Sequence, residues 1–513
     1  MSLLTRIGVR AGGRLARTRV GEAIVVHAPD GVTAEARVIA ESVPADPDHE
    51  LVVADLPPAS PAETWKSFLA ALPRGRGPLR VVSGQEPREI PPYVGQWLAD
   101  QTGRTVLAPY GTVNFGAGWL FVHSADQSGW VSYRRDAKPA WKGKRFPRPS
   151  WDSIEVGQVR SAGLRAVAEP LPAGVWLRPD VDADVLATGR ARLTRTLPCL
   201  PAAPAIVLGA PDVASVELSD IMAYWRTLPP AIAASARFVR YGGVTVRDGA
   251  TLGQTLADTL DAEVFCYNGI PAGTPDAPDV LTLRADGSLG WNTFAQVLAH
   301  RPHGAGTGRP VVHRPPVAGL GEVAPGVYWY GPDVVLEVVP AGLWIRPADQ
   351  LTDPAGVRAA PLDPTHNLLF YEATEPARAD RLRELAEGLV SRIDDATRPA
   401  TRLVPSTTLS GAGQAARSIA SPASPAAPVP PPPPPAVSVA SPTTPVPVMT
   451  TPEPQPSEPS SISTMLAPEP REPEADAPDD TDLPWLSRLM ETMVIPAPAR
   501  LSEMERHDDR GDR

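Results

Sequence analysis

Three histidines of this chain have the residue type and the spacing of metal ligands. His300, His303 and His313 could offer three imidazole nitrogens to one ion. No acidic or thiol partner lies close to them in the sequence, and the glycine-rich segment 304–308 favours a loop around them. The sequence therefore predicts no metal site here.

Two further patterns resemble ligand sites but lack the residues that would complete them. Asp180, Asp182 and Asp184 alternate as in a calcium loop, yet neither the turn glycine nor the closing glutamate follows. The glycines of 304–308 resemble a nucleotide loop, but they follow a predicted helix instead of a strand, and Pro310 stands where a helix should begin. The sequence therefore predicts no cofactor.

The only two cysteines, Cys199 and Cys266, are the candidate thiol nucleophiles. Cys199 lies in a proline-flanked loop, and Cys266 lies inside a predicted apolar strand. Both surroundings favour a small buried hydrophobe over a reactive thiolate, and the two positions fit neither a zinc motif nor a disulfide framework. His27, which follows an apolar strand, is interpreted as a structural or surface residue.

A basic segment at 134–148 carries Trp141 and Phe146 between its charges. It could contact an acidic partner, the acidic tail of the chain or nucleic acid; the alternative is a charged loop exposed to solvent. The net charge of −10 argues against a general nucleic-acid or anionic-membrane binder, because both need a basic face.

The composition of the 513 residues predicts a globular protein that is cytoplasmic on synthesis. No apolar run reaches the roughly 20 residues that a membrane span needs. The arginine-rich start, residues 1–20, lacks the apolar region of a secretory signal and is predicted to be a basic arm. Export by a route that needs no signal peptide is the alternative.

The last part of the chain differs from the rest in composition. Residues 399–513 hold 25 of the 64 prolines, 8 Lys+Arg, 15 Asp+Glu and one aromatic residue, Trp485. Such a segment cannot bury enough apolar surface to offset its conformational entropy, so 398–480 and 497–513 are predicted to be disordered. This proline-rich tail is either a spacer or a docking site for a partner that recognises proline or phosphate.

One tail segment, 481–496, is predicted to form a short amphipathic helix. Pro484 fits its first turn and Pro496 would end it. Its apolar residues recur at helical spacing and would need a partner surface, in this chain or another; the alternative is a disordered apolar stretch. The predicted partner-binding residues are Trp485, Leu486, Leu489, Met490 and Met493.

Several short motifs occur twice in similar form, which indicates an internal repeat. Two of them keep the same order and nearly the same spacing, and a third returns at about twice that distance. The pairs are PAGVWLRP at 172–179 with PAGLWIRP at 340–347, GQWLAD at 95–100 with GQTLAD at 253–258, and DPDHEL at 46–51 with DPTHNL at 363–368.

Around these motifs, short apolar strands alternate with amphipathic helices, as in parallel strands joined by helical crossovers. The sequence predicts the α/β class, with two tandem repeated modules of short, mainly parallel sheets and β-hairpin inserts. One predicted hairpin pairs 119–122 with 130–133, and another pairs 280–283 with 289–291. The modules are predicted at 21–158 and 159–320, followed by an incomplete third half-module at 321–397.

The order strand, helix, strand, helix with Leu-Ala-Asp, then a Val-Leu-Ala-Pro-x-Gly strand resembles a module of large actinobacterial polymorphic-toxin-like proteins. That module in turn resembles the caspase-like core of autoprocessing cysteine peptidases. The resemblance covers roughly 46–149 and 202–302. It implies a His-Gly pair after one strand and an Ala-Cys pair after the next, where a thiolate attacks a carbonyl and the histidine handles the proton.

The positions that match this dyad contain neither the histidine nor the cysteine. The resemblance therefore implies a fold that has lost its chemistry. The degenerate positions are Ala54, Asp55, Ser83 and Gly84 in the first module, and Gly209, Ala210, Arg240 and Tyr241 in the second.

These observations favour a non-enzymatic scaffold or interaction protein whose tail recruits an unidentified protein partner. One alternative is an accessory or delivery component of a polymorphic-toxin or type VII-secretion-linked system. The other is a hydrolase with an unrecognised site beyond the carboxyl ends of the strands, near Ser83, Gly84, Arg240, Tyr241 and Asn268.

Overall fold

The computed structural model describes residues 14–409, except 58–59, 117, 124–127, 247–250, 305, 307 and 355. The predicted tail from 410 onward, including the helix at 481–496, lies outside the described residues, as does most of the predicted basic arm. None of the described helices is long and apolar enough to cross a membrane.

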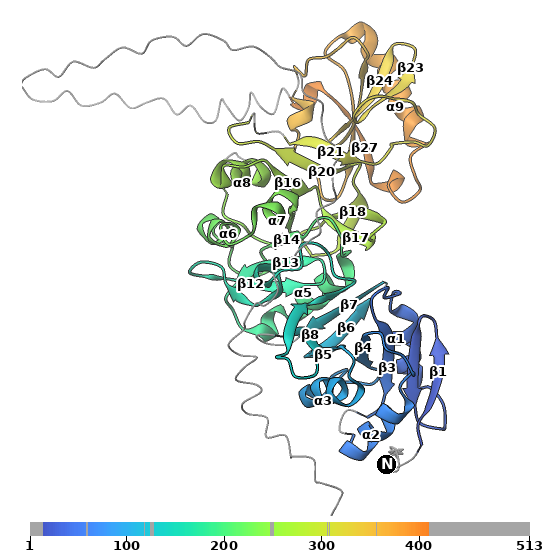
Figure 1. The fold of residues 1–513 in the computed structure, drawn as a ribbon. Coiled ribbons are helices and arrows are strands. Elements are labelled where there is room, and N and C mark those ends of the chain that lie inside the picture. Colours follow the sequence, from blue (N-terminus) through green and yellow to red (C-terminus); the bar gives the residue numbers. More distant parts are fainter. Residues whose placement is uncertain are drawn as a thin grey trace, which may run out of the picture. The chain divides into compact units, whose positions relative to one another are not determined.

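The first part of the chain forms a mixed seven-stranded sheet in the order β1-β2-β3-β4-β5-β8-β9, coloured blue to cyan in Figure 1. Strands β2 to β5 are parallel, and β1, β8 and β9 are antiparallel to their neighbours. The strands are Ala16–Val20 (β1), Ala23–His27 (β2), Glu50–Asp55 (β3), Leu79–Ser83 (β4), Val106–Tyr110 (β5), Gly129–Tyr133 (β8) and Ala140–Gly143 (β9). Thr112–Gly116 (β6), Trp119–His123 (β7) and Arg145–Phe146 (β10) form a second, three-stranded sheet.

Three helices connect the parallel strands: Ala34–Ser42 (α1), Ala62–Ala71 (α2) and Pro92–Thr102 (α3). Thr33 caps α1, since its Oγ1 accepts a hydrogen bond from the Ala36 N–H at 3.2 Å. Proline occupies the first position of α3, and Gly103 ends that helix with a φ of 66°. Successive residues of each strand point to opposite faces, so two hydrophobic cores form, one on each face of the sheet.

The second sheet has eight strands in the order β11-β12-β13-β14-β15-β16-β20-β21, and β13 to β16 are parallel. Its strands are Arg160–Ser161 (β11), Ala166–Leu171 (β12), Gly174–Pro179 (β13), Ala205–Leu208 (β14), Arg237–Arg240 (β15), Val264–Tyr267 (β16), Ala295–His300 (β20) and Arg309–His313 (β21). The helices are Ile154–Gly157 (α4), Ala183–Thr196 (α5), Leu218–Trp225 (α6), Pro230–Ser235 (α7) and Leu252–Leu260 (α8). Ile270–Thr274 (β17), Ala277–Leu283 (β18) and Leu289–Asn292 (β19) form a separate three-stranded sheet.

The third sheet has six strands in the order β22-β23-β24-β25-β26-β27, of which β25, β26 and β27 are parallel. The strands are Glu322–Ala324 (β22), Val327–Gly331 (β23), Val334–Val339 (β24), Gly342–Pro347 (β25), Asn367–Tyr371 (β26) and Thr401–Pro405 (β27). Pro376–Val390 (α9) joins β26 to β27, and short 3-10 helices lie at Val357–Ala359 and Arg398–Ala400. Buried leucines of α9 contribute to the core of this sheet.

The prediction of an α/β chain is confirmed, but the sheets are mixed and not mainly parallel. In the first two sheets helical crossovers make the central strands parallel, whereas short turns, such as the one between β1 and β2, return the chain antiparallel at the margins. In the third sheet the edge strand β27 is also parallel to its neighbour. The segments 16–20 and 401–405 are strands, so the last residues of the predicted arm and the first residues of the predicted linker belong to the fold.

The predicted hairpin of β7 with β8 is wrong. Strand β7 pairs with β6 and β10, while β8 pairs with β5 and β9. The turn between β6 and β7 is shorter than the segment between β7 and β8, so it costs less loop-closure entropy. The second predicted hairpin is confirmed, because β18 and β19 pair antiparallel.

Candidate functional site

The carboxyl ends of β3 and β4, where the resemblance places a catalytic dyad, are filled by internal contacts. Asp55 is buried and accepts hydrogen bonds from Thr33 N at 2.7 Å, Thr33 Oγ1 at 2.8 Å and Gln85 Nε2 at 2.7 Å. Ser83 Oγ donates to the Gln85 carbonyl at 3.1 Å. Asp55 therefore holds the start of α1 and the loop after β4, which is a structural role.

Gly84 and Ala54 leave no space between these strand ends. The Gly84 N–H donates to the Ala54 carbonyl at 2.8 Å. A Cβ at Gly84 would lie 2.8 Å from the Cβ of Ala36 and 3.0 Å from Cγ1 of Val53, closer than carbon atoms approach without displacement. The backbone of this loop thus packs directly on α1.

The carboxyl ends of β14 and β15 are closed in a different way. Trp176 is fully buried and donates from Nε1 to the Gly209 carbonyl at 2.7 Å. The ring of Tyr241 meets Trp176 edge-to-face at 6.2 Å between centroids. A Cβ at Gly242 would lie 2.2 Å from Ala210 N. Of the degenerate positions in this sheet, Arg240 is the one whose side chain is exposed.

The strand register corrects the predicted match between the two sheets by one residue. Ala54 pairs with Ser83, and Leu208 pairs with Arg240, so Leu208 and not Gly209 stands at the level of Ala54. Gly209 then stands at the level of Asp55. The sequences of these short strands are too dissimilar to show which residues of the two sheets correspond. The hydrogen-bonded pairing of neighbouring strands shows which residues lie opposite each other.

The same level of the third sheet is occupied by Glu372, which the sequence analysis did not single out. It is buried and accepts hydrogen bonds from Ser406 Oγ at 2.9 Å, Gln350 Nε2 at 3.0 Å and Thr374 N at 2.9 Å. The sequence feature that could have identified Glu372 is its place directly after an apolar segment, as for Asp55. Asn268, which was suggested for an unrecognised site, donates to the carbonyls of Ala295 and Pro340 at 3.0 and 2.8 Å.

Burial suppresses the acidity of both thiols. Desolvation raises the pKa of Cys199 to about 11 and the pKa of Cys266 to about 12. Cys266 lies within β16 with a side chain in the hydrophobic core, as predicted. The thiolate, the reactive form of cysteine, is therefore scarce at both positions near neutral pH.

We expect iodoacetamide to label Cys199 and Cys266 of the folded chain slowly. At pH 8 a thiol with a pKa near 11 is about 0.1% thiolate, against about a quarter for an ordinary cysteine, so labelling should be on the order of 100-fold slower than for free cysteine. Mass spectrometry of timed samples measures the rate, and the chain in urea supplies the unfolded control. Labelling of the folded chain at the rate of free cysteine would contradict the assignment.

The structure does not bring the three candidate metal ligands together. His300 is buried under the α8 backbone at Gly253, the His303 N–H donates to Asp258, and His313 pairs with Glu322 at 2.9 Å. Among the described residues no group of three or more His, Cys, Asp and Glu is arranged to hold a metal. The glycine segment 304–308 follows strand β20 and not the predicted helix.

The other singled-out polar residues have local structural contacts. Asp182 is the N-cap of α5 and accepts from Asp184 N at 3.1 Å. His27 is buried; its Nε2 lies 2.8 Å from Thr18 Oγ1 and its Nδ1 lies 2.7 Å from the Ala28 carbonyl. These contacts support the prediction that His27 has a structural role.

The GQxLAD motif has the same contacts in both of its occurrences. Gly95 of α3 lies against the ring of Tyr133, and Gly253 of α8 lies against the ring of His300; a Cβ there would be 2.4 and 2.2 Å from ring atoms. The following glutamine donates to the motif's aspartate at 2.8 Å in each case. It also donates to the Arg134 carbonyl at 3.0 Å in one and the Arg301 carbonyl at 2.9 Å in the other. The motif therefore joins a helix to the neighbouring antiparallel strand.

We expect His300 to make this joint between helix and strand sensitive to acid. Burial lowers its pKa, and its buried Nδ1 has no hydrogen-bond partner among the described residues. Below about pH 6.5, His300 of the unfolded chain therefore binds a proton more readily than His300 of the folded chain. The free energy of unfolding should fall by up to about 1.4 kcal/mol per pH unit below that value. Urea unfolding between pH 7.5 and 5.5 measures the slope.

The matched control comes from the first sheet, where an aromatic residue occupies the equivalent place. A His300→Phe variant should lose this part of the acid dependence, since Tyr133 shows that a six-membered ring fits against such a glycine. Equal pH slopes in the parent and the variant would show that His300 does not titrate as its burial implies.

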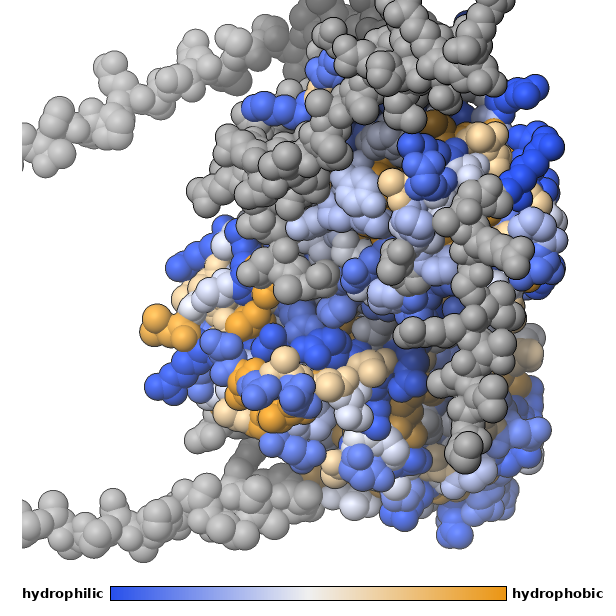
Figure 2. Space-filling model, turned by 90° about the horizontal axis from the view of Figure 1, so that it is seen from below, coloured by the Kyte–Doolittle hydropathy of each residue, from blue (hydrophilic) through white to orange (hydrophobic). Residues whose placement is uncertain are grey.

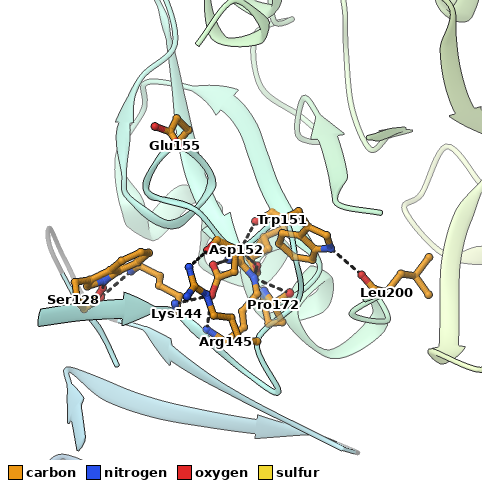
Figure 3. Close-up of polar contacts among 12 residues, drawn as sticks. Ser128, Lys144, Arg145, Trp151, Asp152, Glu155, Pro172 and Leu200 are labelled. Atoms are coloured by element: carbon orange, nitrogen blue, oxygen red, sulfur yellow. Dashed lines mark hydrogen bonds and ion pairs between the residues drawn. The ribbon is translucent and has the colours of Figure 1, made fainter. Parts of the chain in front are cut away.

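The basic segment 134–148 is neither a free basic patch nor a loop that is exposed throughout. Two adjacent basic residues of this segment, Lys144 and Arg145, are 1% and 3% exposed. Figure 3 shows Arg145 directed at Asp152, with which it forms an ion pair. Asp152 Oδ2 also accepts from the backbone N–H groups of Lys144 and Arg145 at 2.8 and 3.0 Å.

Arg145 joins the first sheet region to the turn between β12 and β13. Its Nε donates to the Pro172 carbonyl at 2.9 Å, and its Nη2 donates to the carbonyls of Leu171 and Gly174 at 2.5 and 2.7 Å. The indole of Trp151 lies 4.6 Å from the guanidinium and donates to the Leu200 carbonyl at 2.8 Å (Figure 3). We call Arg145, Asp152 and these carbonyls the Arg145 junction.

The motif PAGxWxRP belongs to a second kind of buried ionic cluster, which occurs twice. Glu169 accepts from Arg178 Nε at 2.5 Å and pairs with Arg190. Glu337 accepts from Arg346 Nε at 2.7 Å, and from Arg358 Nε and Nη2 at 2.5 and 2.9 Å. The motif is recognisable in the sequence, but neither glutamate was predicted; their signal was that each lies three residues before the motif.

Comparisons of the chain with protein-family models, with curated proteins and with solved structures give no match.

Proposed function

We propose that the chain is a non-enzymatic scaffold built from copies of one degenerate α/β module. The first and the second sheet each contain four central parallel strands, flanked on both sides by antiparallel strands. The contacts of GQxLAD recur in the first and second sheets, and the Glu–Arg cluster recurs in the second and third, which supports a common origin of the units. Among the described residues, the third unit has no counterparts of α3 and β5 after β27.

The observation that carries the proposal is the state of the strand ends. At the strand ends where the resemblance implies a histidine and a cysteine, the chain has neither residue. Asp55 and Ser83 are held there by internal hydrogen bonds, and the Gly209 carbonyl accepts one from Trp176. Both thiols carry raised pKa values. We also propose that the resemblance to modules of polymorphic-toxin-like proteins reflects descent from a caspase-like peptidase that lost its dyad.

A hydrolase assay of the full chain tests this function. Fluorogenic peptide and ester substrates should be cleaved no faster than in buffer, because no activated nucleophile is expected. The Cys199→Ala, Cys266→Ala double variant is the matched control and should give the same background. Turnover by the parent that disappears in the double variant would refute the scaffold proposal and favour a cysteine hydrolase.

The partner of the scaffold is proposed to bind the tail. On the face drawn in Figure 2 the described surface is mainly hydrophilic, and hydrophobic residues occur in small separate areas. Single exposed side chains such as Leu164, Leu351 and Val185 are ordinary for a soluble surface. By sequence, the apolar stripe around Trp485 and Leu489 offers a more continuous docking element.

A further inference from the structure

A groove of about 540 Å³ lies between the β6–β7 hairpin and helix α5. Phe115 and Trp119 come from the hairpin, and Arg190 and Arg195 come from the helix. This volume is in the range of small-molecule sites in proteins. The walls are held in place through strand β10, which pairs with β7 and carries Arg145 of the Arg145 junction.

The residues that line the groove carry more positive than negative charge. Three arginines line it, Arg88, Arg190 and Arg195, while none of the described lining residues is Asp or Glu. Arg190 is held by Glu169, but that carboxylate is shared with Arg178, so the cluster keeps one positive charge. Among the described residues, Arg195 forms no ion pair with a carboxylate; its Nε donates to the Ala191 carbonyl at 3.2 Å.

Arg88 has an unused donor in this setting. Its guanidinium lies 4.9 Å from the Phe115 ring and pairs with Glu86, which is exposed. Its Nε is buried and has no hydrogen-bond partner among the described residues. A buried donor without an acceptor is energetically unfavourable. Its φ of 58° is also unusual for a residue with a side chain, so the structure maintains Arg88 at this place against a local cost.

We propose that this groove binds a small anionic molecule that carries a planar ring. Guanidinium groups bind phosphate and carboxylate oxygens through N–H donors. Arg88 and Arg195 offer such donors from two walls, whereas Nε and Nη2 of Arg190 donate to Glu169, so Arg190 contributes charge. Trp119 and Phe115 are only partly buried and offer ring faces beside them. Such a ligand would contact elements of both the first and the second unit. The proposal goes beyond the scaffold function, because it makes that scaffold responsive to a ligand.

Four probes separate the two parts of this chemistry in calorimetric titrations of the full chain. Adenosine has the ring alone, pyrophosphate has the oxyanion alone, ADP has a ring with phosphate, and benzene-1,3,5-tricarboxylate has a ring with carboxylates. We expect ADP or the tricarboxylate to bind with a Kd below about 1 mM and at least about tenfold tighter than adenosine and pyrophosphate. Which of the two binds distinguishes a phosphate ligand from a carboxylate ligand.

Variants assign the binding to the groove. Arg195→Ala and Arg88→Ala should each weaken the better probe at least about tenfold, and Trp119→Ala should weaken it without changing the affinity for pyrophosphate. Arg226→Ala, which removes an exposed arginine outside the groove, is the matched control and should bind like the parent. Melting curves without ligand show whether each variant is folded.

Four outcomes would overturn the proposal. None of the four probes binds; or pyrophosphate binds as tightly as the ring-bearing probes; or the folded Arg195→Ala and Arg88→Ala variants bind like the parent. Binding of an acidic peptide such as poly-glutamate in place of all small probes would also overturn it, and would instead indicate a peptide-docking surface.

Discussion

An Arg145→Ala variant should lose about 3–5 kcal/mol of unfolding free energy, the range measured when one partner of a buried ion pair is removed. The side chain is 3% exposed, and its loss leaves Asp152, which is 1% exposed, without its cation. The carbonyls of Leu171, Pro172 and Gly174 lose donors at the same time. Urea unfolding followed by tryptophan fluorescence measures the change, because Trp151 lies beside the guanidinium.

Two variants make the Arg145 result specific. Arg145→Lys should recover little, since a lysine cannot supply the planar set of donors that reaches Asp152 and three carbonyls together. Arg134→Ala removes an exposed arginine of the same basic segment and should change the unfolding free energy by less than about 0.5 kcal/mol. Equal effects of Arg145→Ala and Arg134→Ala would show that the junction contributes no more than surface charge.

A Glu337→Gln variant should lose about 3 kcal/mol at pH 7. Glu337 is 8% exposed and its carboxylate accepts from two arginines, of which Arg346 is 5% exposed and would keep its buried charge. We expect the low end of the range for such pairs, because the Arg358 side chain is 36% exposed and water can solvate it. Thermal and urea unfolding measure the difference from the parent.

The Glu337 cluster should also give a defined pH dependence. Burial opposes ionisation, but the hydrogen bonds and charges of Arg358 and Arg346 outweigh it and hold the pKa of Glu337 below its usual range. The carboxylate therefore stabilises the fold above about pH 4.5, and this contribution is lost as the pH falls through the lower pKa of the folded state. The difference between parent and Glu337→Gln should shrink accordingly in acid.

Glu387→Gln is the surface control for this prediction. Glu387 pairs with Arg383 one helical turn away on α9, with both side chains more than half exposed. Its loss should cost less than about 0.5 kcal/mol. If Glu337→Gln were as mild as Glu387→Gln, the buried cluster would not stabilise the third sheet, and the recurrence of its geometry in the second sheet would need another explanation.

Local periodicity in the sequence was sufficient to find most helices and central strands. Trp65 and Phe68 fall on one face of α2 at helical spacing and are buried, and the apolar run of β3 is buried throughout the strand. These patterns depend on residues a few positions apart, so they survive in the linear sequence. The margins were harder, because β1 and β27 are short strands whose pairing depends on partners already in place.

The candidate site shows the same division. The absence of a histidine and a cysteine from the matched positions can be read directly from the sequence. The roles of Asp55 and Glu372 could not, because their hydrogen-bond partners include Gln85 and Ser406, about 30 residues away. For the same reason the basic segment resembled a surface patch until the structure placed Arg145 against the turn between β12 and β13.

By itself the sequence determined the α/β class, the recurring motifs, the two thiols and the different composition of the tail, since each follows from residue type and local spacing. Only the tertiary structure decided which charges are buried, how the strand levels correspond and where a cationic groove lies. Those features arise when side chains distant in sequence are desolvated together, and the hydrogen bonds and charges that compensate the desolvation come from other elements of the fold.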